Sequence, residues 1–160
     1  MKTVGIAMLF GLCTLIGFRL GEKKGARLNT LRRLLKDLQL FEERIAAGRG
    51  TLTEIASEKE SMLSGMLRAY LDALEQGETE SAAAGRAVKE LKEGSAEHAG
   101  MLMFFTGLSM GSRTDLIERA NRLSPTLERA ETEAETEAKQ ARVFRVSGML
   151  VGAGAAILLL

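Results

Sequence analysis

The chain has 160 residues and a formal net charge of +1, which suits one modest domain rather than several. Its single histidine excludes histidine clusters and paired-histidine metal sites, and its single cysteine excludes an internal disulfide. Its many Ala, Leu, Glu, Lys, Arg and Met residues and its one proline favour helix throughout.

The small net charge hides a segregation of charge along the chain. Residues 19–36, the first basic collar, hold seven Lys/Arg and one acidic residue. Residues 37–138 hold eleven basic and twenty acidic residues, a net charge of −9. Residues 139–145, the second basic collar, hold three basic residues and no acid. An acidic body therefore lies between two basic collars, with an apolar segment beyond each collar.

The first apolar segment, residues 3–20, contains the run TVGIAMLFGLCTLIGF. The length of this segment and the lack of charge in the quoted run predict an uncleaved transmembrane helix. A secretory signal peptide is the alternative, since Lys2 precedes the apolar run. No small-x-small cleavage site follows, because Arg19 and the sequence GEKKGAR come next.

The leucine-rich stretch TLRRLLKDLQLFEERI, residues 30–45, has apolar residues at helical spacing. Gly48 is a candidate for the end of this helix. Thr51 and Glu54 have the spacing of a capping box, which predicts a new helix at that point. The inward-facing stripe is expected to comprise Leu31, Leu34, Leu35, Leu38, Ile45 and either Phe41 or Glu42.

Residues 61–77 repeat the helical stripe and end at Gly77. An alanine-rich helix is predicted over residues 81–93, and a further helix over residues 97–108, with its inward face formed by Leu102, Phe105 and Leu108. The apolar stripe of residues 61–77 comprises Leu63, Met66, Leu67, Tyr70, Leu71 and Leu74.

Ser112 and Asp115 predict the capped start of a last helix. That helix meets Pro125, where it either kinks or is restarted by Ser124 as a fresh N-cap. The following ERAETEAETEAKQAR has few large apolar residues and predicts a solvated stalk. Overall we predict an all-α fold, in which residues 21–138 form a compact bundle of about six helices with a C-terminal charged stalk.

Residues 139–160 comprise the second basic collar and a second apolar segment. From Val143 onward this segment would span about 27 Å as a helix, close to the roughly 30 Å of a bilayer core. It predicts a second transmembrane helix. Small residues at four-residue spacing predict close helix packing in lipid. They are Ala7 and Gly11, Gly17 and Gly21, and Gly148, Gly152 and Ala156.

The two collars predict the topology, because Lys and Arg remain on the cytoplasmic side of short flanking regions. Both collars flank the acidic body, so we expect the body in the cytoplasm and both termini outside. A nucleic-acid surface is disfavoured, since no aromatic residues are interleaved with the basic ones. The candidate topology anchors are Arg19, Lys23, Lys24, Arg27, Arg142 and Arg145.

No catalytic constellation is present in the sequence. His98 is isolated on a polar helix start, and Cys13 lies in an apolar segment without a neighbouring histidine. No phosphate-binding or dinucleotide-binding glycine motif is found. We therefore expect a non-enzymatic membrane-anchored interaction module without a cofactor or a small-molecule substrate.

The order of segments resembles the stage III sporulation protein AB family of endospore-forming bacteria. The resemblance lies in Gly17-Phe18 followed by a basic stretch, in a leucine-rich helix that runs into a glycine and a Leu-x-Glu restart, in a later glycine pair, and in the closing RVFRVSGMLVG. The residues that carry it are Gly17, Phe18, Leu31, Leu38, Glu42, Ile45, Gly48, Leu52, Glu54, Gly107, Gly111, Arg142, Phe144, Arg145, Gly148 and Gly152.

This resemblance implies a cytoplasmic domain similar to the six-helix domains of type II secretion and type IV pilus platform proteins. It implies a place in the outer forespore membrane, on the mother-cell side, in the channel between mother cell and forespore. The implied partners are the cognate hexameric AA-type ATPase and the other membrane proteins of that channel, and a homo-oligomer is possible. The acidic body would dock the ATPase. A membrane-tethered signalling protein with two membrane helices is the alternative. The candidate docking residues are Glu131, Glu133, Glu135 and Glu137.

Overall fold

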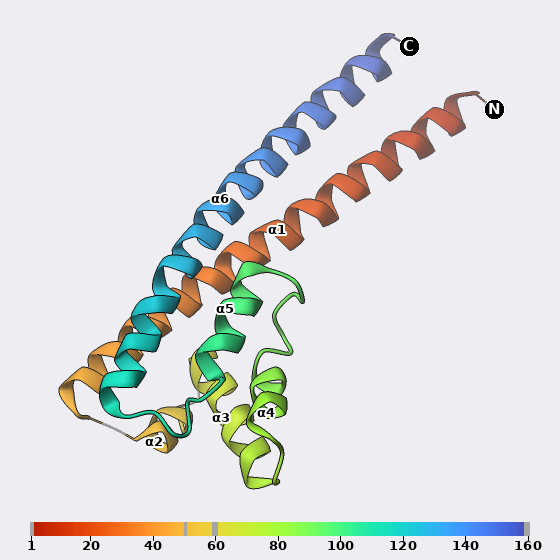
Figure 1. Ribbon diagram of the computed structural model, residues 1–160. Coiled ribbons are helices and arrows are strands. Elements are labelled where there is room, and N and C mark those ends of the chain that lie inside the picture. The colour runs from red at the N-terminus through yellow and green to blue at the C-terminus, as the bar shows by residue number, and fades with distance from the viewer. Residues whose placement is uncertain (1, 50, 59–60, 159–160) are drawn as a thin grey trace. The chain divides into compact units, whose positions relative to one another are not determined.

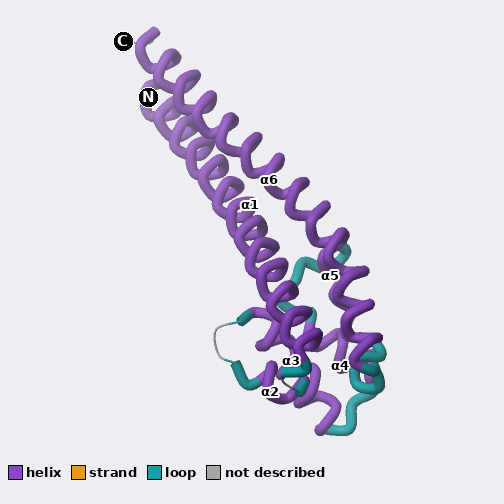
Figure 2. The backbone as a smooth tube through the Cα atoms, turned by 90° about the vertical axis from the view of Figure 1, so that its left-hand side faces the viewer, coloured by secondary structure: helices purple, strands orange, loops and turns teal. Residues whose placement is uncertain are grey.

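The computed structural model describes the backbone of residues 2–49, 51–58 and 61–158, and the side chains of residues 22–49, 51–58 and 61–143. The described residues form six helices and no strand (Figures 1 and 2), so the all-α prediction is confirmed. The helices are α1 (Lys2–Ala47), α2 (Leu52–Ala56), α3 (Met62–Glu75), α4 (Glu80–Ala87), α5 (Ala96–Phe105) and α6 (Arg113–Leu158).

The six helices form two compact units. The first unit, Leu31–Glu131, holds the end of α1, the short helices α2–α5 and the start of α6, and is called the bundle below. The second unit combines Met1–Thr30 with Thr132–Leu160 and is called the helix pair. Helices α1 and α6, each of 46 residues, contribute to both units without interruption. The boundaries that the sequence suggested, residues 21 and 138, fall within the helix pair.

The leucine stripe of α1 faces the core of the bundle. Phe41 is 2% exposed while Glu42 is only partly buried, so Phe41 occupies the inward position that the sequence left open. Partial burial raises the pKa of the Glu42 carboxyl above its usual value. The buried members of the stripe are Leu31, Leu34, Leu35, Leu38, Phe41 and Ile45.

Successive short helices pack on one another, α2 on α3, α3 on α4 and α4 on α5. An aromatic cluster joins the elements that are distant in sequence. The Phe41 ring of α1 lies 5.7 Å from Phe104 of α5, in a T-shaped arrangement. The neighbouring Phe105 ring lies 5.5 Å from Tyr70 of α3. Such pairs add specific geometry to the burial of large apolar area, so this cluster fixes α5 against α1 and α3.

The start of α2 forms as the sequence predicts. The backbone N–H of Glu54 donates to the Thr51 hydroxyl, and the backbone N–H of Thr51 donates to the Glu54 carboxylate at 2.8 Å. The start of α3 combines a local cap and a distant one. The Ser61 side chain accepts from Ser64, and the Asp37 carboxylate of α1 accepts from the backbone N–H of Met62 at 2.7 Å. Both arrangements satisfy N–H groups that a helix start leaves unpaired.

Arginine side chains satisfy carbonyl groups at three helix ends. Arg113, at the start of α6, donates to the carbonyl oxygens of Ile45 and Ala46 at the end of α1. Arg68 of α3 donates to the carbonyl of Ala56 at 2.8 Å, at the end of α2. Arg119 of α6 donates to the carbonyl of Thr106, the residue that caps α5. These cations face helix C-termini, where positive charge is favourable.

Glycines follow the ends of α1 and α3, as the sequence suggests for Gly48 and Gly77. Gly48 has a φ of +67° and Gly77 a φ of +82°, the left-handed conformation typical of a helix C-cap. The prediction that these two glycines mark helix ends is therefore confirmed.

The helix predicted over residues 81–93 is too long. Helix α4 ends at Ala87, and the following residues form turns up to Gly94, which has a φ of +76°. Val88 and Leu91 are both buried in this turn segment. Tertiary packing thus overrides the helix propensity of residues 88–93. In α5, Phe105 and the following Leu108 are buried as predicted, but Leu102 is partly exposed and Phe104 takes its place in the core.

Helix α6 begins with the predicted Ser112 and Asp115 capping pair, since the Ser112 backbone N–H donates to the Asp115 carboxylate at 2.8 Å. It continues through Pro125, so the proline does not end the helix. The segment predicted to be a solvated stalk has one buried edge of small residues. Ala130 and Ala134 are each 1% exposed, while the glutamates between them are partly or fully exposed.

Candidate functional site

The candidate docking glutamates lie along one helix but in two different units. Glu131 belongs to the bundle, where its carboxylate accepts from the Arg32 side chain of α1 at 2.9 Å. The Arg32 side chain is 51% exposed, so this pair is a solvated one and contributes only modestly to stability. The carboxylate of Glu131 is therefore partly neutralised within the chain.

The other three glutamates belong to the helix pair. The Glu135 carboxylate lies 3.0 Å from Lys139, one helical turn further along. The Glu137 carboxylate lies 3.8 Å from the Arg27 guanidinium of α1. Glu133 is exposed and forms no ion pair with another described residue. Of the four carboxylates, that of Glu133 thus offers the least compensated negative charge to a partner.

The candidate topology anchors are described only in part. Lys23 and Arg142 are exposed, and Lys24 and Arg27 are partly buried. Arg19 and Arg145 lie outside the residues whose side chains are described. So do all the residues predicted to pack within the membrane: Ala7, Gly11, Gly17, Gly21, Gly148, Gly152 and Ala156. Within the described residues, no helix has the length and apolar character that a membrane crossing requires.

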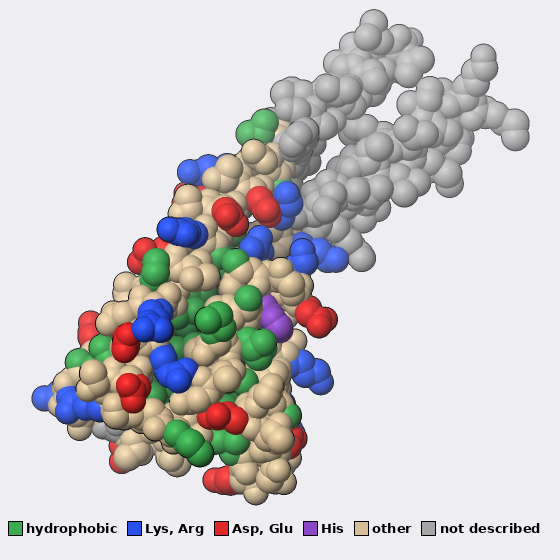
Figure 3. All heavy atoms as spheres, viewed as in Figure 1, with side chains coloured by type: hydrophobic (Ala, Val, Ile, Leu, Met, Phe, Trp, Pro, Cys, Tyr) green, Lys and Arg blue, Asp and Glu red, His purple; other side chains and the backbone are tan. Residues whose placement is uncertain are grey.

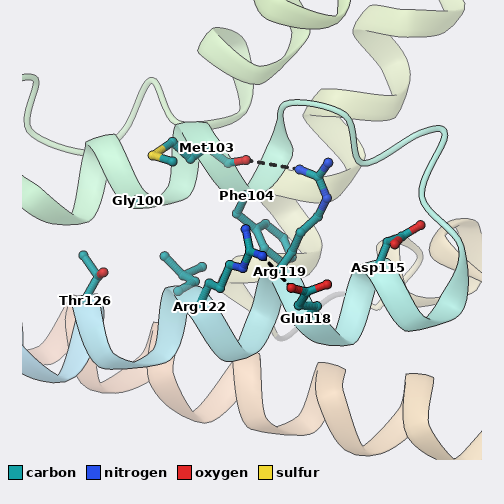
Figure 4. Close-up of a pocket in the computed structure, with 9 residues that line it drawn as sticks. Gly100, Met103, Phe104, Asp115, Glu118, Arg119, Arg122 and Thr126 are labelled. Carbon is teal, nitrogen blue, oxygen red and sulfur yellow. Dashed lines mark hydrogen bonds and ion pairs between the residues drawn. The ribbon is translucent and has the colours of Figure 1, made fainter.

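A groove lies between α5 and the first half of α6 (Figure 4). It encloses about 340 Å³. Gly100 lies at its base, where a Cβ atom would come within 2.9 Å of a Leu123 methyl group. The absence of a side chain at Gly100 therefore lets α5 and α6 approach closely. The lining residues are Gly100, Met103, Phe104, Asp115, Glu118, Arg119, Arg122, Leu123 and Thr126.

The charged residues of the groove mostly satisfy one another. Arg122 and Glu118 form an ion pair one turn apart on α6, and Arg119 is engaged by the end of α5 (Figure 4). Hydrogen bonds from Ser112 lower the pKa of the Asp115 carboxyl, with a smaller contribution from the Arg119 charge. The groove therefore has apolar walls and a charge-balanced rim.

Two methionines are unusually exposed, Met103 in the groove lining and Met110 in the segment between α5 and α6. Met103 is 75% exposed and Met110 is 91% exposed. Methionine adapts its shape to irregular partner surfaces, whereas a binding surface is marked by a contiguous apolar patch and not by single exposed side chains. Neither residue was predicted from the sequence to lie at a candidate site. Nothing in the sequence distinguishes Met103 from its buried neighbour Phe104 except its place on the helical face.

A polar cluster ties the segment between α5 and α6 to α3 and α4. The Tyr70 hydroxyl donates to the Glu80 carboxylate at 3.0 Å, and the Ser109 hydroxyl donates to the same oxygen at 2.9 Å. The hydrogen bond from Ser109, followed by that from Tyr70, lowers the pKa of Glu80, while burial raises the pKa of Tyr70. These contacts hold the connecting segment in place beside the groove.

The described side chains form no candidate metal site. Among them, no three His, Cys, Asp or Glu residues cluster as metal ligands. His98 lies in the first turn of α5, where its backbone N–H donates to the Ser95 hydroxyl at 3.2 Å. The groove lining supplies carboxylates, guanidinium groups and one hydroxyl, each placed in the helical framework described above.

The fold and these surfaces define the class: an all-helical bundle protein whose two longest helices extend beyond the bundle. The family model for stage III sporulation protein AB matches residues 2–160, and the chain belongs to this family. The protein therefore has a role in sporulation. Neither a curated protein nor a solved structure matches the chain at a significant level.

Proposed function

We propose that the protein is a non-enzymatic, two-pass membrane component of the channel between mother cell and forespore. In this proposal the bundle lies in the mother-cell cytoplasm, the two terminal segments cross the outer forespore membrane, and both termini lie outside. The observation that carries the proposal is the continuity of α1 and α6. Each is a single helix that includes bundle residues, a basic collar and an apolar segment.

The positions of the collars support this topology. Charged residues are absent from residues 3–18 and from residues 146–160. On the bundle side of each apolar segment, the nearest charges are basic, Arg19 and Arg145. Basic residues at both junctions favour retention of the intervening domain on the cytoplasmic side.

We further propose that the bundle docks a hexameric AA-type ATPase and passes the motion of that enzyme to the membrane segments. Family membership supports this partner through the resemblance to secretion platforms, and the acidic character of residues 37–138 supports an electrostatic contribution. Helices α1 and α6 link the bundle to the terminal segments without an intervening loop, which supports a mechanical role for them.

Charge reversal on α6 tests the electrostatic part of this proposal. Reversing several of the four candidate glutamates should weaken docking, and Glu133→Lys is the cleanest single change because it breaks no described ion pair. We expect affinity for the purified cognate ATPase to fall by about 1 kcal/mol, roughly fivefold, at low salt. The measurement is a titration of the ATPase onto the full-length protein in lipid nanodiscs.

Glu90→Lys is the matched control, because Glu90 is an exposed acidic residue elsewhere in the bundle. The control should leave affinity within about twofold of that of the unmodified protein, as expected for a surface charge outside the contact. Equal affinity of the unmodified protein and the Glu133→Lys variant would contradict docking through this face of α6.

A membrane-tethered signalling protein is the second candidate function. Sensors with two membrane helices usually place the intervening domain outside the cell. Affinity purification from gently solubilised membranes of the sporulating host separates the two. Recovery of a hexameric ATPase with other sporulation membrane proteins is expected here, whereas recovery of a kinase or receptor without the ATPase would favour signalling.

A further inference from the structure

Several cations in the described part of the helix pair lie outside the ion pairs that its described residues form. Lys23, Lys24 and Arg142 form no ion pair with another described residue. Lys139 is paired only with Glu135 on its own helix, and its side chain remains 75% exposed. These residues come from two chain segments more than 110 positions apart.

The ion pair between Arg27 and Glu137 brings these cations to one level. It joins α1 to α6 at 3.8 Å. Lys23 and Lys24 precede Arg27 by about one helical turn, and Arg142 follows Glu137 by a little more than one turn. At a rise of about 1.5 Å per residue, all three lie roughly 5–8 Å from the ion pair, toward the chain termini. We call Lys23, Lys24 and Arg142 the cation ring.

Charge is ordered along the helix pair. Glu133 and Glu135 precede Glu137 on α6 and so lie on the bundle side of the ion pair, while the cation ring lies on the terminal side. Figure 3 shows Lys and Arg side chains, with some Asp and Glu side chains among them, near the end of the described part of the helix pair. Glu22 is the one acidic residue in the described part of α1 on the terminal side of Arg27.

An apolar side chain adjoins the ring. Val143, next to Arg142, is 65% exposed and is one of the few large hydrophobic side chains that the described surface leaves open. Exposed cations followed directly by exposed apolar surface match the boundary between anionic headgroups and acyl chains. Carboxylates are repelled from such a boundary, and Glu133, Glu135 and Glu137 lie on its bundle side, whereas Glu22 lies beside Lys23.

We infer that the cation ring binds anionic phospholipid headgroups at the cytoplasmic surface of the membrane. The inference rests on the proposed membrane insertion and adds to it. The general occurrence of Lys and Arg on the cytoplasmic side of membrane proteins does not require a protein to select among lipids. The cation ring, whose members form no ion pair with another described residue, predicts that the protein selects anionic lipids. Each Lys or Arg near an anionic membrane surface raises the affinity of a protein for that surface by about fivefold.

Lipid selectivity of the full-length protein tests this inference. The protein is reconstituted in phosphatidylcholine bilayers with trace spin-labelled phosphatidylglycerol or spin-labelled phosphatidylcholine. Electron paramagnetic resonance then measures the fraction of each lipid that the protein immobilises. We expect phosphatidylglycerol to be preferred by about fivefold at low salt, and the preference to fall in 1 M salt because of screening.

The triple variant Lys23→Gln/Lys24→Gln/Arg142→Gln should reduce the preference to about twofold or less. The control triple variant changes three exposed cations of the bundle and alters net charge equally, so it should keep the preference. The control substitutions are Lys89→Gln, Lys92→Gln and Arg129→Gln.

Three other outcomes distinguish a failure of this inference from a failure of the proposed membrane insertion. Equal immobilisation of both lipids by the unmodified protein would overturn lipid binding by the ring while leaving membrane insertion supported. Equal loss of preference in both triple variants would also overturn it, because net charge and not the ring would then set selectivity. Immobilisation of neither lipid would overturn membrane insertion itself and the inference with it.

Discussion

Replacing Phe105 with alanine should lower the free energy of unfolding of the bundle by about 3–5 kcal/mol. The Phe105 side chain is completely buried, and its ring lies 5.5 Å from Tyr70 and 5.4 Å from Phe104. Truncation would leave a cavity where α5 meets α3 and would remove two aromatic contacts. Few single changes in this chain combine as much lost apolar area with as little room for relaxation.

Thermal and urea unfolding of the full-length protein in detergent, followed by circular dichroism at 222 nm, measures this effect. Met103→Ala is the control, since it removes a large apolar side chain from the same helix at a position that is 75% exposed. The control should change stability by no more than about 0.5 kcal/mol. Similar losses for both variants would show that α5 is not packed as described.

Gly107→Ala should destabilise the bundle by about 1–3 kcal/mol. Gly107 has a φ of +78°, which costs a residue with a side chain about 1–2 kcal/mol. An added Cβ would also lie 2.7 Å from the Arg119 guanidinium. Arg119 would have to move, and its hydrogen bond to the Thr106 carbonyl at the end of α5 would be weakened.

Other glycines provide internal controls for this prediction. Gly77 has a φ of +82° but open space around its Cβ position, so Gly77→Ala measures the backbone cost alone. Gly65 and Gly85 lie within helices with nothing near, so alanine there should stabilise by about 0.5–1 kcal/mol. The same unfolding assay ranks the four variants. A Gly107→Ala variant no less stable than Gly77→Ala would contradict the capping role of Arg119.

Local signals in the sequence predicted much of the helical framework. The stripe from Leu31 to Ile45, the capping pairs at Thr51 and Ser112, and the glycine at position 77 were all identified correctly. Each depends on residues within one or two helical turns. Such signals survive in the fold because capping hydrogen bonds and helical periodicity are set by nearby residues.

Contacts between distant residues could not be predicted in this way. Arg113 caps a helix that ends 66 residues before it, and Asp37 caps one that begins 25 residues after it. The glutamates of α6 looked like a free acidic face, yet Glu131 and Glu137 are paired with arginines of α1. The length of α4 was overestimated for the same reason, because burial of Leu91 is decided by tertiary packing.

The two long helices change how the candidate site is understood. The sequence suggested a bundle with a separate stalk and separate membrane segments. The structure instead has α1 and α6 as continuous helices, each 46 residues long. The cations and carboxylates near the terminal segments thus belong to a pair of helices joined by the ion pair of Arg27 and Glu137, and not to a flexible linker.

The measurement that tests the central proposal most directly is the membrane topology of the full-length protein. Single cysteines are introduced in a Cys13→Ser background, either at the exposed Met103 position or as an added residue at each terminus. A membrane-impermeant maleimide is then applied to intact protoplasts and to inverted vesicles of non-sporulating cells that produce the protein, in which the cytoplasmic membrane receives it. We expect the terminal cysteines to be labelled in protoplasts and Met103→Cys only in inverted vesicles. Labelling of Met103→Cys in intact protoplasts, or recovery of the protein outside the membrane fraction, would contradict the account.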